Sequence, residues 1–529
     1  MLQLYKHVAI ICVSIVGIYC TGNHLKYKLK DTNGIFPNKN VLLIIGDDAG
    51  FETQVYNNSI CQTPNLNKLG EQSIVFRNAF TSVSSCSPSR STILTGLPEH
   101  QNGMYGLHQK LHHFNSFDSV RSLPAVLQKH NIRTGIIGKK HVGPEDVYPF
   151  DFAFTEENNS ILQVGRNISR IKELVRKFLH MNDSRPFFLY VAFHDPHRCG
   201  HTNPKYGEFC EKFGNGQPGM GEISDWTPKY YSPDEVIVPY FVPDTPAARA
   251  DIAAQYTTVG RLDQGIGLIL KELTDAGLRD NTLVIYSSDN GIPFPSGRTN
   301  LYDPGMSEPM LVSNPEHREQ WNQVSDDLVS LLDITPTVLD WFDIRYPHYK
   351  LFNAPVHLTG KSLLPLTEKL VKSDDVLDFS TALFASQSLH EVTMYYPMRV
   401  VRTKKYKLIH NLNFKMPFPI DQDFYISPTF QDILNRTQTQ VTTHWYKNLT
   451  EYYYRPQWEL YDLIKDTKET NNLADCAEFQ AILFELRDIL HSWQLKTADP
   501  WICGPSAVLE NSGRFKEHPR CLPLYNDLT

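Results

Sequence analysis

Apolar and polar residues alternate along the first two thirds of the chain in two distinct patterns. Between short apolar runs, apolar residues recur every three or four positions in segments 161–180 and 252–273, as in amphipathic helices. The runs themselves have the length and composition of strands buried on both faces: 41–46, 135–138, 186–193 and 282–287. This alternation predicts an α/β fold with a large mixed, mostly parallel sheet flanked by helices.

The pattern changes after about residue 375. Residues 398–410 alternate between apolar and polar positions, which predicts antiparallel strands, and residues 458–462 predict another short strand. Residues 477–495 have the periodicity of a closing helix. We therefore expect a large catalytic domain over residues 23–375 and a smaller C-terminal α+β domain with an antiparallel sheet over residues 376–529.

The beginning of the chain predicts a targeting segment. Lys6 precedes an apolar run over residues 8–20, which is too short to span a bilayer comfortably. A cleaved signal peptide over residues 1–22 is therefore expected, and an uncleaved membrane anchor is the alternative. Because no later stretch approaches the roughly 20 apolar residues of a spanning helix, we expect no membrane span after cleavage.

Glycosylation signals and cysteines fit the secretory route. The chain carries six Asn-x-Ser/Thr triplets, which begin at Asn57, Asn158, Asn167, Asn182, Asn435 and Asn448. Of nine cysteines, two lie in the signal segment, and two pairs are close enough in sequence for local disulfides: Cys199 with Cys210, and Cys503 with Cys521. The remaining cysteines are Cys61, Cys86 and Cys476.

The overall charge narrows the class of partner. The formal net charge is −7, whereas nucleic-acid-binding proteins usually carry a basic face. We therefore expect no nucleic-acid partner. An anionic substrate stays possible, because a pocket can be locally positive on an acidic protein.

Polar side chains follow the predicted strands. Asp47 and Asp48 follow one strand, and Asp289 and Asn290 follow another. In parallel sheets, ligands bind beyond the carboxyl ends of the strands, so these side chains are expected to converge. Four oxygen-bearing side chains suit a hard cation such as Ca²⁺ or Mg²⁺, and no His/Cys spacing indicates zinc. Turn formation or helix capping is the alternative for either pair alone.

The sharpest chemical signal is the sequence Cys-Ser-Pro-Ser-Arg over residues 86–90, which continues to Leu-Thr-Gly at 94–96. It resembles the signature of the sulfatase family, whose cysteine is oxidised to formylglycine in the endoplasmic reticulum by a formylglycine-generating enzyme. The resemblance implies the same conversion at Cys86, and a buried free thiol is the alternative. A hydrated aldehyde carries two hydroxyl groups, so one can attack sulfur and the other can expel sulfate.

The resemblance also implies a metal site and an alkaline-phosphatase-like fold. One calcium ion would be held by the modified Cys86 together with Asp47, Asp48, Asp289 and Asn290. Such an ion lowers the pKa of the attacking hydroxyl and neutralises sulfate oxygens.

Basic residues near these motifs are candidates for charge stabilisation and proton transfer. Arg90 and Lys139 are expected to position the nucleophile and stabilise charge. His141 is expected to assist the hydroxyl that eliminates sulfate, and His197 to act as the acid on the leaving-group side.

Two further residues are expected to bind substrate. Asp195 would orient the substrate or assist the neighbouring His197, and Arg298 would grip sulfate or a substrate carboxylate. A solvated surface position is the usual alternative for a single arginine.

Within the family, the chain resembles the sulfamidase branch most closely, in segments 103–108, 112–118, 194–200 and 289–295. Arg298 stands where many sulfatases carry a lysine, as in that branch, whereas Asp303 replaces an expected bulky aromatic residue. The resemblance implies hydrolysis of the S–N bond of terminal N-sulfoglucosamine in heparan sulfate oligosaccharides. It also implies a homodimer and a lysosomal location, and plain secretion fits the same signals.

Three rival functions remain open on the sequence. A glycosaminoglycan O-sulfatase would share the core motifs. A phosphatase or phosphodiesterase of the alkaline-phosphatase fold would place Ser or Thr at the nucleophile and bind two zinc ions. A catalytically dead, sugar-binding homologue is disfavoured by the intact Cys86, Pro88 and Arg90.

Overall fold

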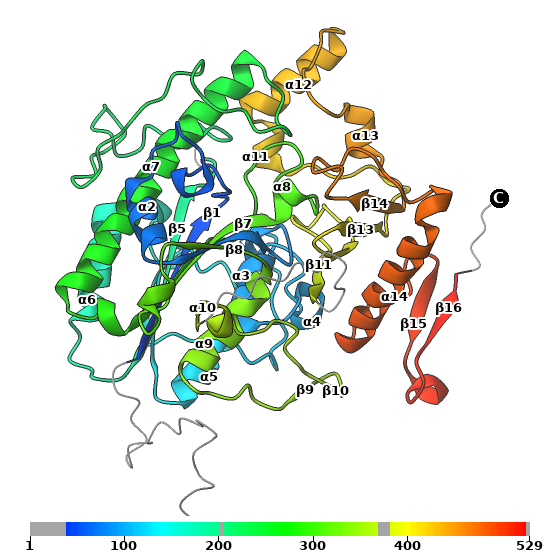
Figure 1. Ribbon diagram of the computed structural model, residues 1–529, viewed down its shortest axis with the longest axis horizontal. Coiled ribbons are helices and arrows are strands. Elements are labelled where there is room, and N and C mark those ends of the chain that lie inside the picture. Colours follow the sequence, from blue (N-terminus) through cyan, green and yellow to red (C-terminus); the bar gives the residue numbers. More distant parts are fainter. Residues whose placement is uncertain (1–38, 110, 201–204, 369–380, 525–529) are drawn as a thin grey trace, which may run out of the picture. The chain divides into compact units, whose positions relative to one another are not determined.

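The apolar runs form the centre of an eight-stranded sheet in the computed structural model, which describes residues 39–109, 111–200, 205–368 and 381–524 (Figure 1). The strand order is β4-β3-β5-β1-β6-β7-β2-β8. Strand β7 is antiparallel to both its neighbours, and every other neighbouring pair is parallel. The strands are β1 (Asn40–Asp47), β2 (Ile74–Phe80), β3 (Arg133–Gly138), β4 (Phe152–Thr155), β5 (Phe187–Pro196), β6 (Thr282–Ser288), β7 (Ser307–Ser313) and β8 (Gln323–Ser330).

Helices cover both faces of this sheet, as the alternation of apolar runs and amphipathic segments predicts. Side chains along β1 point alternately to two cores. Leu42 and Ile44 pack in the core that contains residues of α2 (Pro64–Glu71), α6 (Ile168–Leu179) and α7 (Pro246–Asp275). Leu43 and Ile45 pack in the core that contains residues of α3 (Cys86–Thr95), α5 (Leu123–Lys129) and α9 (Ile334–Trp341). The central strands are buried on both faces for this reason.

The predicted helix over residues 161–180 is interrupted. A π-helical turn, η2 (Leu162–Arg166), precedes Asn167, whose extended backbone (ψ 94°) ends the turn. The Asn167 side chain accepts a hydrogen bond from Arg170 N and caps α6. The break leaves Arg166 buried beneath the carboxyl end of β5.

A second, antiparallel sheet forms from the C-terminal part of the chain in the order β11-β12-β13-β14. Its strands are β11 (Leu383–Gln387), β12 (Met398–Arg402), β13 (Tyr406–Asn411) and β14 (Trp458–Asp462). Helix α14 (Gln480–Lys496) covers one face through Leu486 and Leu490. The other face packs with Phe80 and Met306 of the large domain. The predicted fold class, with a large mixed sheet and a smaller antiparallel one, is confirmed.

The remaining elements are short. They are α4 (Glu99–Asn102), α8 (Asp303–Met306), β9 (Lys350–Leu351), β10 (Ala354–Pro355), α10 (Leu364–Glu368), α11 (Gln422–Tyr425), α12 (Pro428–Gln438), α13 (Leu449–Tyr453), β15 (Ala507–Glu510) and β16 (Arg520–Pro523). Both predicted disulfides form, Cys199–Cys210 and Cys503–Cys521. The predicted signal peptide and the predicted domain boundary near residue 375 lie outside the described residues.

Candidate active site

The candidate site is built at the carboxyl ends of the two central strands. Strands β1 and β6 pair in parallel, so the residues that follow them lie side by side. Asp48 takes a left-handed backbone (φ 59°), which turns the chain sharply after Asp47. The amide of Asn290 donates to a carboxylate oxygen of Asp48 (2.6 Å), and the backbone N–H of Asp48 donates to Asp289 (3.1 Å). All four predicted metal ligands from these strands are therefore together and buried.

Cys86 is the first residue of α3 and lies against this cluster. Its Sγ and carboxylate oxygens of Asp47 and Asp289 are all within 4.8 Å of one another. The first N–H groups of a helix and its dipole favour an anion at this end. Burial raises the pKa of the Cys86 thiol well above its usual range, with further contributions from the nearby carboxylates. Since the thiolate is the reactive form of cysteine, an unmodified thiol here is a poor nucleophile.

Two buried cations bind the carboxylates from the opposite side. Arg90, one turn along α3, lies 3.2 Å from Asp47 and 2.8 Å from Asp289. The Lys139 ammonium, just after β3, lies 2.5 Å from Asp47. Burial alone would raise the pKa of Asp47, but the cations of Lys139 and Arg90 hold this pKa well below its usual range. Asp47 is therefore ionised.

The oxygen-bearing residues fit a hard divalent cation. The Asn290 Oδ1 atom is buried and has no hydrogen-bond partner among the described residues. Burial raises the pKa of Asp48 to about 8, opposed by Arg298 and reinforced by Asp47 and Asp289. Burial likewise raises the pKa of Asp289 to about 6. Three carboxylates and an unpaired amide oxygen in one buried place are the donor set that a cation such as Ca²⁺ prefers.

His197 and Arg298 lie on the other side of Asp48. The Arg298 guanidinium donates to Asp48 (2.6 Å) and lies 3.1 Å from Nε2 of His197. Nδ1 of His197 lies 2.7 Å from the backbone carbonyl of Arg198, so it carries the proton and Nε2 accepts from Arg298. Burial lowers the pKa of His197 well below its usual range. The imidazole is thus neutral before a substrate binds.

His141 also lies in this region, in a strained left-handed conformation (φ 53°). Its Nε2 is 3.2 Å from Oε1 of Gln109, which identifies Nε2 as the donor. Its Nδ1 is buried without a hydrogen-bond partner among the described residues. Burial, reinforced by Lys139 and Arg90, lowers the pKa of His141 well below its usual range. An unpaired, unprotonated nitrogen can accept a proton from a nearby hydroxyl.

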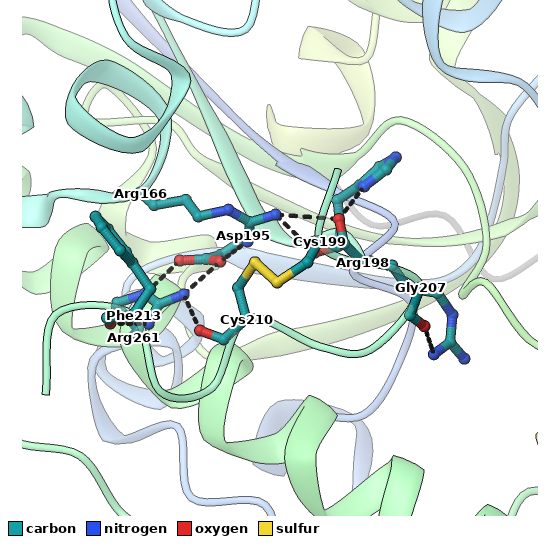
Figure 2. Close-up of a disulfide and its surroundings, with 9 residues drawn as sticks. Arg166, Asp195, Arg198, Cys199, Gly207, Cys210, Phe213 and Arg261 are labelled. Atoms are coloured by element: carbon teal, nitrogen blue, oxygen red, sulfur yellow. Dashed lines mark hydrogen bonds and ion pairs between the residues drawn. A yellow bond between two sulfur atoms is a disulfide. The ribbon is translucent and has the colours of Figure 1, made fainter. Parts of the chain in front are cut away.

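Asp195 does not lie with the predicted substrate-binding residues. Its carboxylate is fully buried and takes hydrogen bonds from both Arg261 (2.7 and 2.9 Å) and Arg166 (Figure 2). Alternate residues of β5 point to opposite faces of the sheet, so Asp195 faces α7 and not the site. Arg166 also donates to the backbone carbonyl of His197 (2.8 Å). The expected direct contact with substrate is replaced by an ion-pair network that holds the backbone of His197.

Three further side chains lie at the site without any motif in the sequence that predicts them, all from the C-terminal part of the chain. Asp421 and Asp423 both accept hydrogen bonds from Arg298, and His390 pairs with Ser85 beside Cys86 (2.8 Å). The sequence around Asp421, Asp423 and His390 contains no motif that indicates a site. They lie more than 100 residues away from Arg298 or Ser85 in sequence. Only the packing of the two sheets brings them together.

Asp303, which was expected at the wall of the substrate pocket, forms ion pairs with the C-terminal sheet. Its carboxylate pairs with Arg402 (2.9 Å) and Lys407 (3.0 Å) from the C-terminal sheet. Burial would raise the pKa of Asp303, but Arg402 and Lys407 hold it below its usual range. Asp303 is therefore an ion-pair link between the large domain and the C-terminal sheet.

Comparison with known proteins identifies the class to which this fold and site correspond. The model of the family described as Sulfatase matches residues 39–344, which is more than half of the chain. The chain belongs to the sulfatase family. A second family model, described as N-sulphoglucosamine sulphohydrolase, C-terminal, matches residues 297–418.

Individual relatives narrow the resemblance. The chain is 65% identical over 491 residues to human N-sulphoglucosamine sulphohydrolase, a match that covers 93% of this chain and 96% of the relative. It is 26% identical to an ulvan-active sulfatase of Formosa agariphila, over 93% of this chain and 81% of the relative. The predicted membership of the family, and the closeness to its sulfamidase branch, are thereby confirmed.

Solved structures share the fold at low identity. One is a protein in complex with its substrate D-glucosamine-2-N,6-O-disulfate, with a TM-score of 0.60 and 19% identity over 87% of this chain and 98% of that chain. Another is phosphonate monoester hydrolase of Agrobacterium radiobacter, with a TM-score of 0.59 and 17% identity over 92% of this chain and all of that one. These likenesses show a common architecture for sulfate and phosphonate enzymes.

Proposed function

We propose that this chain hydrolyses the S–N bond of terminal N-sulfoglucosamine in heparan sulfate, and releases sulfate and the free amino sugar. The observation that carries the proposal is the position of Cys86 at the start of α3, within 4.8 Å of the carboxylates of Asp47 and Asp289. The substrate assignment is supported by the 65% identity to human N-sulphoglucosamine sulphohydrolase.

Cys86 is the proposed source of the nucleophile, after oxidation to formylglycine by the formylglycine-generating enzyme. A hydrated formylglycine would supply one hydroxyl to attack sulfur and a second to expel sulfate. The high pKa of the unmodified thiol supports this proposal, because a buried thiol among carboxylates does not ionise readily. Nδ1 of His141, buried and without a hydrogen-bond partner among the described residues, would accept the proton of the second hydroxyl.

Calcium is the proposed metal ion, held by Asp47, Asp48, Asp289 and Asn290 together with residue 86. When bound, such an ion lowers the pKa of a coordinated hydroxyl and offsets the charge of sulfate. The buried oxygen ligands support the assignment. Around them, Arg90 and Lys139 orient the carboxylates and add positive charge where the transition state gains negative charge.

His197 is the proposed acid on the leaving-group side, and Arg298 the proposed sulfate-binding cation. The Nε2 atom of His197 faces Arg298, Asp48 and Asp423, each within 3.8 Å. The Nε atom of Arg298 is buried and has no hydrogen-bond partner among the described residues, so its N–H is the proposed donor to a sulfate oxygen. Asp195 supports His197 indirectly, through Arg166.

The lysosome, reached by the secretory pathway, is the proposed location, and a homodimer is the proposed assembly. The sequon residues Asn57, Asn158, Asn182 and Asn448 are exposed, as attached glycans require. The described part of the chain contains no helix long and apolar enough to cross a membrane.

The test is release of sulfate from matched sugars by the purified protein. We expect cleavage of N-sulfoglucosamine, and at least ~100-fold slower cleavage of glucosamine 6-sulfate, because only one leaving group is an amine. Faster cleavage of the O-sulfated sugar would identify a glycosaminoglycan O-sulfatase. Binding of both sugars without sulfate release, by protein whose residue 86 is converted, would identify a sugar-binding homologue.

Removal of the metal gives a second test of the same site. Incubation with a calcium chelator is expected to abolish sulfate release, and added Ca²⁺ to restore it. The melting temperature should also fall on chelation, because Asp47, Asp48 and Asp289 then repel one another. Full activity after chelation, with no metal in the protein, would contradict the proposed metal site.

A further inference from the structure

The cluster around Arg298 carries more negative charge than its arginine can balance. Three carboxylates contact this guanidinium: those of Asp48, Asp421 and Asp423. A divalent ion at the proposed metal site would take up the charge of Asp48. The two aspartates of the C-terminal part then share one arginine. Burial raises the pKa of Asp423, opposed by Arg298 and reinforced by Asp421.

Asp421 and Asp423 make different contacts. One oxygen of Asp421 accepts from the backbone N–H of Phe424 (2.9 Å), which caps α11, and from Arg298 (2.9 Å). Asp423 binds Arg298 through one oxygen, and its other oxygen lies 3.8 Å from Nε2 of His197. The Asp423 side chain is 12% exposed, so a ligand can contact it. Asp423 is therefore the carboxylate that faces the proposed leaving-group side.

The leaving group of a sulfamate is an amine, which can become positively charged, whereas that of a sulfate ester is an alcohol, which stays neutral. When the S–N bond breaks, its electron pair stays on nitrogen, which takes one proton and departs as an amine. Nε2 of His197, unprotonated before substrate binds, would take that proton from water and pass it to the nitrogen. A second proton, from water, makes it an ammonium ion. A sulfate ester releases a neutral alcohol instead. A carboxylate beside the leaving atom stabilises the first product and contributes little to the second.

The cluster also offers a hydrogen-bond donor for the sulfate oxygens of the sulfamate group. The Arg298 side chain is 2% exposed, and its Nε has no hydrogen-bond partner among the described residues. An unpaired buried N–H is costly unless a ligand accepts from it. Arg298 therefore offers a donor suited to a sulfate oxygen, and Asp423 offers an acceptor suited to an N–H, on adjacent side chains.

We infer that Asp423, held by Arg298 and backed by Asp421, binds the amine nitrogen of the substrate and product and so sets the preference for N-sulfate over O-sulfate. This inference rests on the proposed function. It assigns a specificity role to a residue of the C-terminal part of the chain, which the cysteine motif does not include.

The test compares binding of two sugars that differ only at this nitrogen. Titration calorimetry with glucosamine and with glucose, on the metal-loaded protein, needs no turnover. The unchanged protein should bind glucosamine at least ~10-fold more tightly than glucose. Asp423→Asn should reduce this preference by roughly 10- to 100-fold and lower kcat/KM for N-sulfoglucosamine by a similar factor, the size of one charge-assisted hydrogen bond.

Controls separate recognition from folding. Asp423→Glu keeps the charge and should restore part of the preference. Asp432→Asn removes the same charge from a partly buried helical pair with Arg436, and should leave both affinities unchanged. Melting temperatures of all variants show whether each is folded. Equal loss of glucosamine and glucose binding in folded Asp423→Asn, or no preference in the unchanged protein, would overturn the inference.

The same experiment keeps the two proposals apart. If the unchanged protein releases no sulfate from N-sulfoglucosamine, the proposed function fails. If it does release sulfate and Asp423→Asn keeps the full preference for glucosamine, only the role of Asp423 fails.

Discussion

Two buried arginines of this chain, Arg298 and Arg399, have opposite surroundings. Arg399 is fully buried and makes a two-point ion pair with Asp499 (2.6 and 2.8 Å), and its third nitrogen donates to backbone carbonyls. One cation meets one carboxylate, and the pair is complete. Arg298 instead meets three carboxylates and keeps one N–H unpaired.

This difference distinguishes buried ion pairs with a structural role from buried charge clusters that bind a ligand. A balanced pair such as Arg399–Asp499 needs no further partner, and removing either member would leave an unpaired buried charge. An unbalanced cluster costs free energy until a ligand completes it. The cluster around Arg298, together with Asp47 and Asp289, is therefore arranged for a metal ion and a substrate. Asp195 meets two arginines, so charge balance does not class it with Arg399–Asp499. Both of its buried oxygens are instead taken by Arg166 and Arg261, which leaves none for a ligand.

The largest expected contrast is between two buried free cysteines, Cys86 beside the charged cluster and Cys61 in an apolar core. Cys86→Ala should lower sulfate release more than ~1000-fold, because the proposed nucleophile is lost, with little change in melting temperature. Cys61→Ala, in an apolar cluster, should keep activity and lose about 1 kcal/mol of unfolding free energy. Assays and melting curves of both variants check this contrast. Activity that survives in Cys86→Ala would break it.

The next effect concerns the complete ion pair. Asp499→Asn leaves the buried charge of Arg399 without its partner, and should reduce the free energy of unfolding by about 3–5 kcal/mol. The molecules that stay folded should keep their kcat/KM, because neither residue contacts the proposed site. Denaturant unfolding combined with an activity assay measures both. An activity loss without destabilisation would contradict the division into two kinds of cluster.

The smallest expected effect is a pH dependence of the free energy of unfolding, caused by His100 near the Arg399–Asp499 pair. His100 is buried between Ser386 (2.9 Å) and Thr497 (2.8 Å), and burial lowers its pKa to about 4. Below the unfolded pKa of about 6.5, the unfolded chain binds a proton that the folded chain does not, so stability falls as pH falls from 6.5 towards 4. By pH 5 this loss is on the order of 2 kcal/mol.

The variant His100→Gln, which has no charge at either pH, should reduce the stability difference between pH 7 and pH 5 by that amount. Chemical denaturation at the two pH values measures it. An identical pH slope in the two proteins would show that His100 is protonated equally in both states.

The strands and the cluster of Asp47, Asp48, Asp289 and Asn290 could be predicted from the sequence because both follow local rules. An unbroken apolar run such as residues 41–46 marks a strand buried on both faces, and polar residues just after such strands meet at one edge of the sheet. The break at Asn167 was missed because the apolar periodicity continues across it. Asp195 is separated from His197 because β5 ends at Pro196. Asp195 shares the strand face of Phe193, which packs in the core with α7, whereas His197 lies beyond the strand. Of its two expected roles, Asp195 has the contacts for supporting His197, through Arg166.

Asp421 and Asp423 could not be found in this way. They reach the site only because the C-terminal sheet packs against Phe80 and Met306, a contact between residues far apart in the chain. No spacing or motif in a single sequence reports such a contact. The part of the site that we assign to specificity is therefore the part that needs the three-dimensional structure.

The most direct test of the account is the mass of the peptide that contains Cys86, isolated from protein made in cells with the formylglycine-generating enzyme. We predict the mass of a formylglycine peptide, lower than that of the cysteine peptide, in a fraction that rises and falls with specific activity across preparations. A fully active preparation in which this peptide carries only unmodified cysteine would contradict the account.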